Sequence, residues 1–155
     1  MPRKYDVVVV GGRCAGSPLA MLLAREGLSV ALVEQATFPR DTLSTHIFQT
    51  SALAFLNRVG VLDAVRATGA PIVNYLDVRQ EWFCARVPLP QRPGDVGGFM
   101  SVRRMLLDSI LLEAAAGAGA EVLMGAKVTA LTRDHGRVTG EIGRASCRER
   151  VSCCV

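Results

Sequence analysis

The sequence predicts an α/β fold in which a parallel β-sheet is flanked by helices. A β-branched run at residues 5–10, YDVVVV, leads into Gly11-Gly12, which is typical of a strand buried on both faces of a parallel sheet. A helical segment, AGSPLAMLLAREG, follows, and a second apolar run at residues 29–33 ends at Glu34. Strand, glycine turn, helix and strand in this order form a βαβ unit with a right-handed crossover.

The first helix is expected to present Leu19, Leu22 and Leu23 on one face, as their spacing is helical. Pro18 fits only in the first turn, where its missing amide hydrogen costs nothing. Gly27 stands where a glycine commonly ends a helix. Residues 15–27 are therefore predicted to form one amphipathic helix.

The remainder of the chain alternates between helical and extended patterns. The strongest later helix covers residues 102–116, with Leu106, Ile110 and Leu111 expected on one face. Shorter helices are expected at 51–60 and 61–69, strands within 72–89 and at 121–125, and a hairpin over 126–140.

Composition and charge exclude several classes of protein. The chain has 155 residues, of which 50% are hydrophobic and 21% are charged, as in a single globular domain. Its net charge of +4 is small and scattered, so nucleic acid is not expected as a partner. No apolar run approaches the ~20 residues of a membrane span, and the apolar part of the N-terminus is too short for a signal peptide. A cytoplasmic location is the expectation.

The last fifteen residues differ from the rest. Three of the 5 cysteines, Cys147, Cys153 and Cys154, lie there, and residues 141–155 show neither helical nor strand periodicity. The stretch EIGRASCRERV can be encoded by a common sequencing-library adapter. We therefore expect residues 141–155 to be a non-native tail and residues 1–140 to be the natural part. The cysteine spacings fit no zinc site, so no metal is predicted.

The segment Gly11-Gly12-Arg13-Cys14-Ala15-Gly16 lies between the first strand and the first helix. It matches the dinucleotide fingerprint G-x-G-x-x-G at its first and last glycines, while Arg13 replaces the middle glycine. The amide groups and dipole at a helix start suit a phosphate. Arg13 is expected to contact or flank that phosphate, and Cys14 to be a small residue that fills the turn. The alternative is a tight turn without a ligand.

Glu34 ends the second strand, where a carboxylate can accept hydrogen bonds from both ribose hydroxyls of an adenosine. It would repel a 2′-phosphate. The alternative is a solvated surface glutamate.

These segments together carry a family resemblance. The stretch VVVVGGRCAGSPLAMLLAREGLSVALVEQATFPRDTLSTH resembles the N-terminus of FAD-dependent oxidoreductases of the para-hydroxybenzoate hydroxylase and geranylgeranyl reductase superfamily. Phe38-Pro39-Arg40 is similar to a segment of flavin-dependent halogenases, and residues 103–108 are similar to the family's R-x-x-L-D helix. The resemblance implies a Rossmann-like FAD-binding fold, with residues 72–89 beginning an antiparallel substrate-domain sheet.

The resemblance also implies residue roles. The glycine turn would hold the FAD pyrophosphate, and Glu34 the adenosine ribose. The loop after Phe38 would lie near the ribityl chain and flavin ring, and a later helix would support the cofactor. The cofactor-binding residues expected in this way are Gly11, Gly12, Arg13, Cys14, Ala15, Gly16, Glu34, Gln35, Arg40, Thr42, Ser44, Thr45 and Arg104. A solvated loop is the alternative for 40–46, where His46 alone does not indicate a general base, and no catalytic residue is assigned.

Two family features are missing: the later D-G and G-D segments find no match before residue 141. We therefore expect an N-terminal fragment, inactive by itself, of a flavin-dependent monooxygenase. It would act on a small organic substrate, with NADH or NADPH as electron donor. The expected protein partner is a flavin reductase or, in a homo-oligomer, a second copy of the same chain. The alternatives are a geranylgeranyl-type reductase, an NAD-binding module without flavin, and a fragment that binds nothing.

Overall fold

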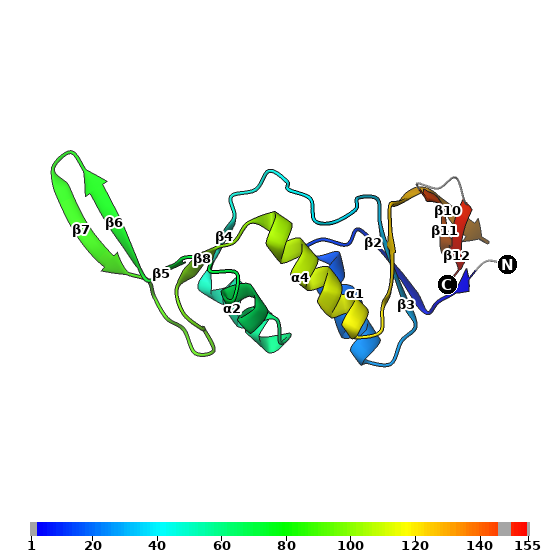
Figure 1. Ribbon diagram of the computed structural model, residues 1–155, viewed down its shortest axis with the longest axis horizontal. Coiled ribbons are helices and arrows are strands. Elements are labelled where there is room, and N and C mark those ends of the chain that lie inside the picture. The colour runs from blue at the N-terminus through cyan, green and yellow to red at the C-terminus, as the bar shows by residue number, and fades with distance from the viewer. Residues whose placement is uncertain (1–2, 146–149, 155) are drawn as a thin grey trace. The chain divides into compact units, whose positions relative to one another are not determined.

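The computed structural model describes residues 3–145 and 150–154, and the chain divides into two compact units (Figure 1). Unit 1 combines Met1–Arg40 with Leu107–Val155, and unit 2 is the intervening segment Asp41–Leu106. One unit is thus inserted into the sequence of the other. Each unit is described separately.

Unit 1 contains the predicted βαβ unit. Strand β2 (Val7–Val10), helix α1 (Gly16–Arg25) and strand β3 (Val30–Glu34) follow one another along the chain, and β2 pairs with β3 in parallel. Strand β9 (Glu121–Met124) pairs in parallel with the other side of β3, giving the order β2-β3-β9. All five residues of the central strand β3 are buried. The α/β fold with a parallel sheet is thus confirmed.

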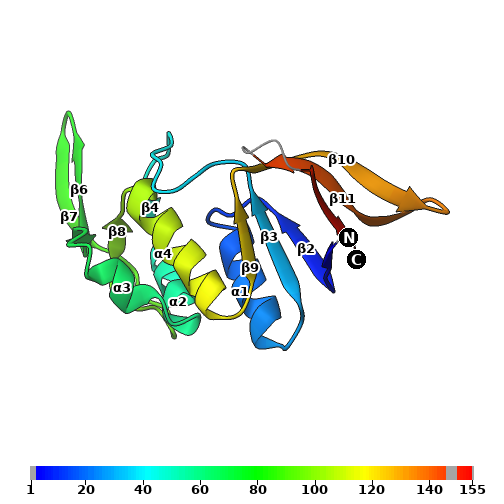
Figure 2. The same cartoon turned by 45° about the vertical axis from the view of Figure 1, so that its right-hand side comes forward.

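Helices α1 and α4 (Arg104–Gly117) lie on the same side of this sheet (Figure 2). This follows from the strand order, because two right-handed crossovers that advance in one direction leave their helices on one face. Helix α4 begins at the end of unit 2 and continues into unit 1.

The predicted buried face of α1 is wrong. Leu19 and Leu22 are exposed, and the buried residues are Ser17, Pro18, Ala20 and Met21. Small side chains on this face allow the helix to lie close to the sheet, whereas a row of leucines would hold it away. The leucine spacing is helical, but it indicates the opposite side of the helix.

The predicted face of α4 is partly wrong. Leu111 is buried as expected, but Leu106 is exposed, and Leu107, Leu112 and Ala115 are buried instead. The leucine pairs 106–107 and 111–112 offer two neighbouring apolar stripes at helical spacing. Sequence periodicity cannot choose between such stripes, and contact with the sheet selects the one through Leu107 and Leu111.

Unit 1 also contains a second sheet with the order β1-β12-β11-β10. Its strands are β1 (Arg3–Lys4), β10 (Ala126–Asp134), β11 (Arg137–Ala145) and β12 (Arg150–Cys154). Strands β10 and β11 form the predicted hairpin, with Asp134 opposite Arg137. The segment expected to be a non-native tail therefore contains strand residues, since it includes the second half of β11 and all of β12. Residues 146–149 and 155 of this segment lie outside the described residues, and its adapter origin stays a prediction.

Unit 2 combines two short helices with a small antiparallel sheet. Helices α2 (Thr50–Arg58) and α3 (Leu62–Arg66) match the predicted helices, and their inward residues Leu53, Leu56 and Val65 are buried. The sheet has the order β4-β8-β5, with β4 (Ile47–Phe48), β5 (Ile72–Val73) and β8 (Phe99–Ser101). Strands β6 (Tyr75–Gln80) and β7 (Phe83–Pro88) form a separate two-stranded hairpin, as the alternation in 72–89 predicts.

Candidate functional site

The turn from Gly11 to Gly16 connects β2 with α1 in unit 1. Gly11 has φ of 101°, a backbone conformation that favours glycine, and its N–H donates to the Val33 carbonyl at 2.7 Å. A Cβ atom on Gly16 would lie 1.7 Å from the Gly11 carbonyl oxygen, so only glycine fits there. These are the roles that the first and last glycines have in the dinucleotide fingerprint.

The turn leaves the start of α1 suited to an anion. The N-cap residue, Ala15, provides no side-chain hydrogen bond to the first amides of the helix. The Ser17 hydroxyl donates to the Gly12 carbonyl at 2.7 Å and fixes the turn from inside. The N-terminus of α1 thus carries the helix dipole and first-turn amides without a capping side chain, which is the arrangement that phosphates use.

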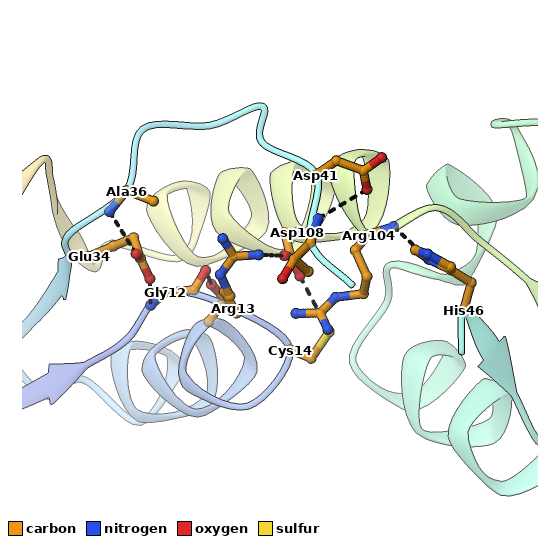
Figure 3. A network of polar contacts seen from close by, with 11 residues as sticks. Gly12, Arg13, Cys14, Glu34, Ala36, Asp41, His46, Arg104 and Asp108 are labelled. Atoms are coloured by element: carbon orange, nitrogen blue, oxygen red, sulfur yellow. Dashed lines mark hydrogen bonds and ion pairs between the residues drawn. The ribbon is translucent and has the colours of Figure 1, made fainter. Parts of the chain in front are cut away.

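Glu34 is buried at the end of β3, with 5% of its surface exposed, and is not the solvated surface residue of the alternative interpretation. Its Oε2 accepts a hydrogen bond from the Gly12 amide at 2.7 Å, and its Oε1 accepts one from the Ala36 amide at 2.8 Å (Figure 3). A carboxylate has about four acceptor sites, so these two bonds leave capacity for ribose hydroxyls. Glu34 therefore fixes the glycine turn and remains suited to the predicted role.

A pocket of about 190 Å³ opens beside Glu34. Drug-sized ligands occupy pockets of roughly 300–1,000 Å³, so this one suits part of a dinucleotide rather than the whole. Three of its residues, Ala126, Lys127 and Val128, were not predicted from the sequence. These three residues are the first of β10. They belong to no sequence motif, because they reach the pocket only through the path that the chain takes after β9. The residues that line the pocket are Val10, Gly11, Val33, Glu34, Gln35, Ala126, Lys127 and Val128.

Arg13 and Cys14 both contact Asp108 on helix α4. Arg13 Nη1 lies 2.7 Å from Asp108 Oδ2, and Cys14 Sγ lies 3.4 Å from Oδ1 (Figure 3). The Arg13 guanidinium also stands over the Phe38 ring, 5.2 Å from its centre. The sequence contained Asp108 within the R-x-x-L-D segment, but the resemblance directed attention to the arginine of that motif alone.

The remaining predicted residues belong to the loop after Phe38 and to the start of α4. Arg40 is an exposed residue at the end of the first segment of unit 1. Thr42, Ser44 and Thr45 lie in unit 2 on an extended loop without helix or strand. The Ser44 hydroxyl accepts a hydrogen bond from the His46 amide at 3.3 Å.

Within unit 2, this loop contacts the start of α4 at two points. The Arg104 amide donates to His46 Nδ1 at 3.3 Å, so a histidine side chain caps the helix (Figure 3). Asp41 forms an ion pair with Arg103, whose hydrogen bond lowers the pKa of this carboxyl below its ordinary value. The structure thus places the predicted Arg104, and its neighbour Arg103, in contact with this loop.

No cluster of potential metal ligands occurs among residues 3–145 and 150–154. In the same described part of the chain, no helix is long and apolar enough to cross a membrane.

Comparison with known proteins gives one family. A family model described as an FAD binding domain matches residues 4–154. The menaquinone reductase of Mycolicibacterium smegmatis is 34% identical over 140 residues, which make up 89% of this chain and 33% of that protein. The tryptophan 2-halogenase of Chondromyces crocatus is 34% identical over 137 residues, or 88% of this chain and 26% of that protein. The chain thus spans a third or less of the length of these curated relatives.

Solved structures have the same fold. The myxobacterial chondrochloren halogenase CndH, described as an FAD-dependent halogenase, superposes with a TM-score of 0.88 at 25% identity, covering 99% of this chain and 36% of that one. A geranylgeranyl bacteriochlorophyll reductase-like protein of Thermoplasma acidophilum superposes with a TM-score of 0.77 at 20% identity, over 100% of this chain and 38% of that one. The second likeness concerns the fold alone.

Proposed function

Since this chain belongs to the FAD binding domain family, we propose that it is the N-terminal part of a flavin-dependent monooxygenase that acts on a small organic substrate. The observation that carries the cofactor assignment is the hydrogen bond of 2.7 Å between Glu34 and the Gly12 amide. It joins the glycine turn to the end of the neighbouring strand, which is where dinucleotides bind in doubly wound sheets.

The described residues fit the adenosine half of FAD. The pocket at β3 and the start of β10 would take the adenosine, and Glu34 would accept hydrogen bonds from its ribose hydroxyls. The first amides of α1 and the turn from Gly11 to Gly16 would bind the pyrophosphate. Gln35 lines the same pocket and would flank the ribose.

The flavin half is proposed from the family resemblance. Arg40, Thr42, Ser44 and Thr45 would lie near the ribityl chain and ring, and Arg104 would support the cofactor from α4. When bound, FAD supplies the redox chemistry, while the protein binds and orients it and excludes water. The electrons would come from NADH or NADPH, directly or through a separate flavin reductase, and the expected location is the cytoplasm.

A second candidate is a flavin-dependent reductase of the geranylgeranyl type. It is favoured by the menaquinone reductase of Mycolicibacterium smegmatis, which is as similar to this chain, at 34% identity, as the tryptophan 2-halogenase. A reductase and a monooxygenase would share the FAD site described above. They would differ in where the electrons go: to a double bond of the substrate, or to oxygen.

The full-length protein tests both proposals. It should be purified with a yellow chromophore, and FAD should be released on denaturation and identified by chromatography and mass spectrometry. Oxygen uptake that depends on NADH or NADPH and an organic substrate would support a monooxygenase, whereas anaerobic oxidation of the donor with stoichiometric reduction of a substrate double bond over many turnovers would support the reductase. A protein that binds NAD and no flavin would contradict both.

A further inference from the structure

Asp108 is a buried anion that lies against the turn proposed to bind a pyrophosphate. Its side chain has 0% exposure, and both of its oxygens face the turn, with Oδ2 on Arg13 and Oδ1 on Cys14. A buried carboxylate is costly unless it is paired, and it also repels other anions at short range. A carboxylate in this place would oppose phosphate binding unless its charge were compensated.

Arg13 meets this need. Its guanidinium lies 2.7 Å from Asp108, and the Arg13 side chain is only 28% exposed, so solvent screens the pair weakly. The Phe38 ring, 5.2 Å from the guanidinium, holds the arginine from another side. These contacts direct the side chain toward α4, which explains how a long residue is accommodated where the fingerprint has its middle glycine.

We infer that Arg13 and Asp108 form a compensating pair, in which Arg13 neutralises Asp108 so that the turn can accept the pyrophosphate. This inference rests on the proposed binding of FAD at the turn. Arg13 is then a positioning residue that acts through Asp108, and the fingerprint departs from glycine at this position because of a residue on another helix. Direct contact between Arg13 and the phosphate is the competing role.

A charge cycle in the full-length protein separates these roles. The variants are Arg13→Gln, Asp108→Asn and the double variant, with Arg133→Gln as a control that removes one exposed positive charge from β10. FAD dissociation constants are measured by flavin fluorescence. Arg13→Gln should weaken binding about tenfold or more, Asp108→Asn should change it less than about threefold, and the double variant should recover to within about threefold of the parent. The control should bind as the parent does.

Two results would overturn the inference. Equal weakening in Arg13→Gln and in the double variant would show that Arg13 is itself a phosphate ligand. Equal weakening in both single variants without recovery would show that the pair only anchors the turn.

The pair can also be tested without cofactor, from the melting temperatures of the apo forms of the parent, the two single variants and the double variant. Arg13→Gln should lower the melting temperature more than the double variant does. If the parent binds no FAD, the proposed function fails, while this comparison still decides whether Arg13 compensates Asp108. A double variant that melts as low as Arg13→Gln would count against the pair.

Discussion

Gly16→Ala tests the close approach between α1 and the glycine turn. The added methyl carbon would lie 1.7 Å from the Gly11 carbonyl oxygen and 3.0 Å from its carbonyl carbon. Both neighbours are backbone atoms, so no side chain can rotate away. Even a close C···O contact measures about 3.3 Å, so helix and turn must separate by roughly 1.5 Å.

The size of the effect follows from this displacement. Forcing extra methylene groups into a packed interior costs about 1–3 kcal/mol, and a clash with backbone places this variant at the upper end. For a domain of this size each kcal/mol lowers Tm by about 2–4 °C, so a loss of about 3 kcal/mol lowers Tm by roughly 6–12 °C. FAD binding should weaken as well, because the amides of the turn move with the helix.

Thermal melting of the full-length apo-protein, followed by circular dichroism, measures the loss. The matched control is Gly117→Ala at the end of α4, where an added Cβ meets nothing within 4 Å. That variant should be neutral or gain up to about 1 kcal/mol from its better helix propensity. If Gly16→Ala melts like the control, helix α1 does not approach the turn as closely as described.

Four further predictions follow. Glu34→Gln should weaken FAD binding by about 1–3 kcal/mol in a fluorescence titration, because one amide donor of the protein then faces the NH₂ group of glutamine; an unchanged Kd would exclude the ribose role. His46→Ala should lower the free energy of unfolding by about 0.5–2 kcal/mol through loss of the α4 cap. His46→Asn, whose side chain can also accept a hydrogen bond, should retain most of that stability in denaturant titrations. Arg103→Gln should raise the pKa of Asp41 toward its ordinary value. The ion pair stabilises the native protein at pH values above the ordinary pKa of Asp41, and this stabilisation is lost as the pH falls through the lowered pKa. An NMR titration of the Asp41 carboxyl in both proteins would measure the difference in pKa. Amplifying the gene from source DNA should show different codons in place of residues 141–155, and a natural EIGRASCRERVSCCV followed by a stop codon would contradict the adapter origin.

The sequence was most informative where local chemistry decides the structure. The β-branched run, the glycine turn and Glu34 lie within thirty-four residues, and each has a conformational requirement that few other residues meet. Gly11 needs positive φ, and Gly16 needs the absence of a side chain. Strand, turn and helix could therefore be placed to within two residues from the sequence.

It was less informative where tertiary contact selects among equal local choices. The leucines of α1 satisfy helical periodicity, yet Leu19 and Leu22 are exposed while Ala20 and Met21 face the core. Periodicity shows that a helix is amphipathic. It assigns the buried face to the most hydrophobic residues, here leucines, whereas a close contact between helix and sheet favours small side chains. The predicted set of residues around the pocket beside Glu34 was incomplete for a related reason, since Ala126 and its neighbours are brought to it only by the path of the chain.

The contact of Arg13 with Asp108 shows what the letters of a motif do not contain. Read locally, arginine in place of the middle glycine weakens the fingerprint, or suggests a phosphate ligand. The side chain also bonds to a residue 95 positions later, on a helix whose position relative to the turn cannot be read from the local sequence. An arginine at this position is tolerated if an acceptor stands within its reach on the packed helix, and Asp108 is buried safely if a cation stands on the turn. Each residue stabilises the other in its place, so the proposed binding of a dinucleotide at this turn depends on the pair as well as on the glycines.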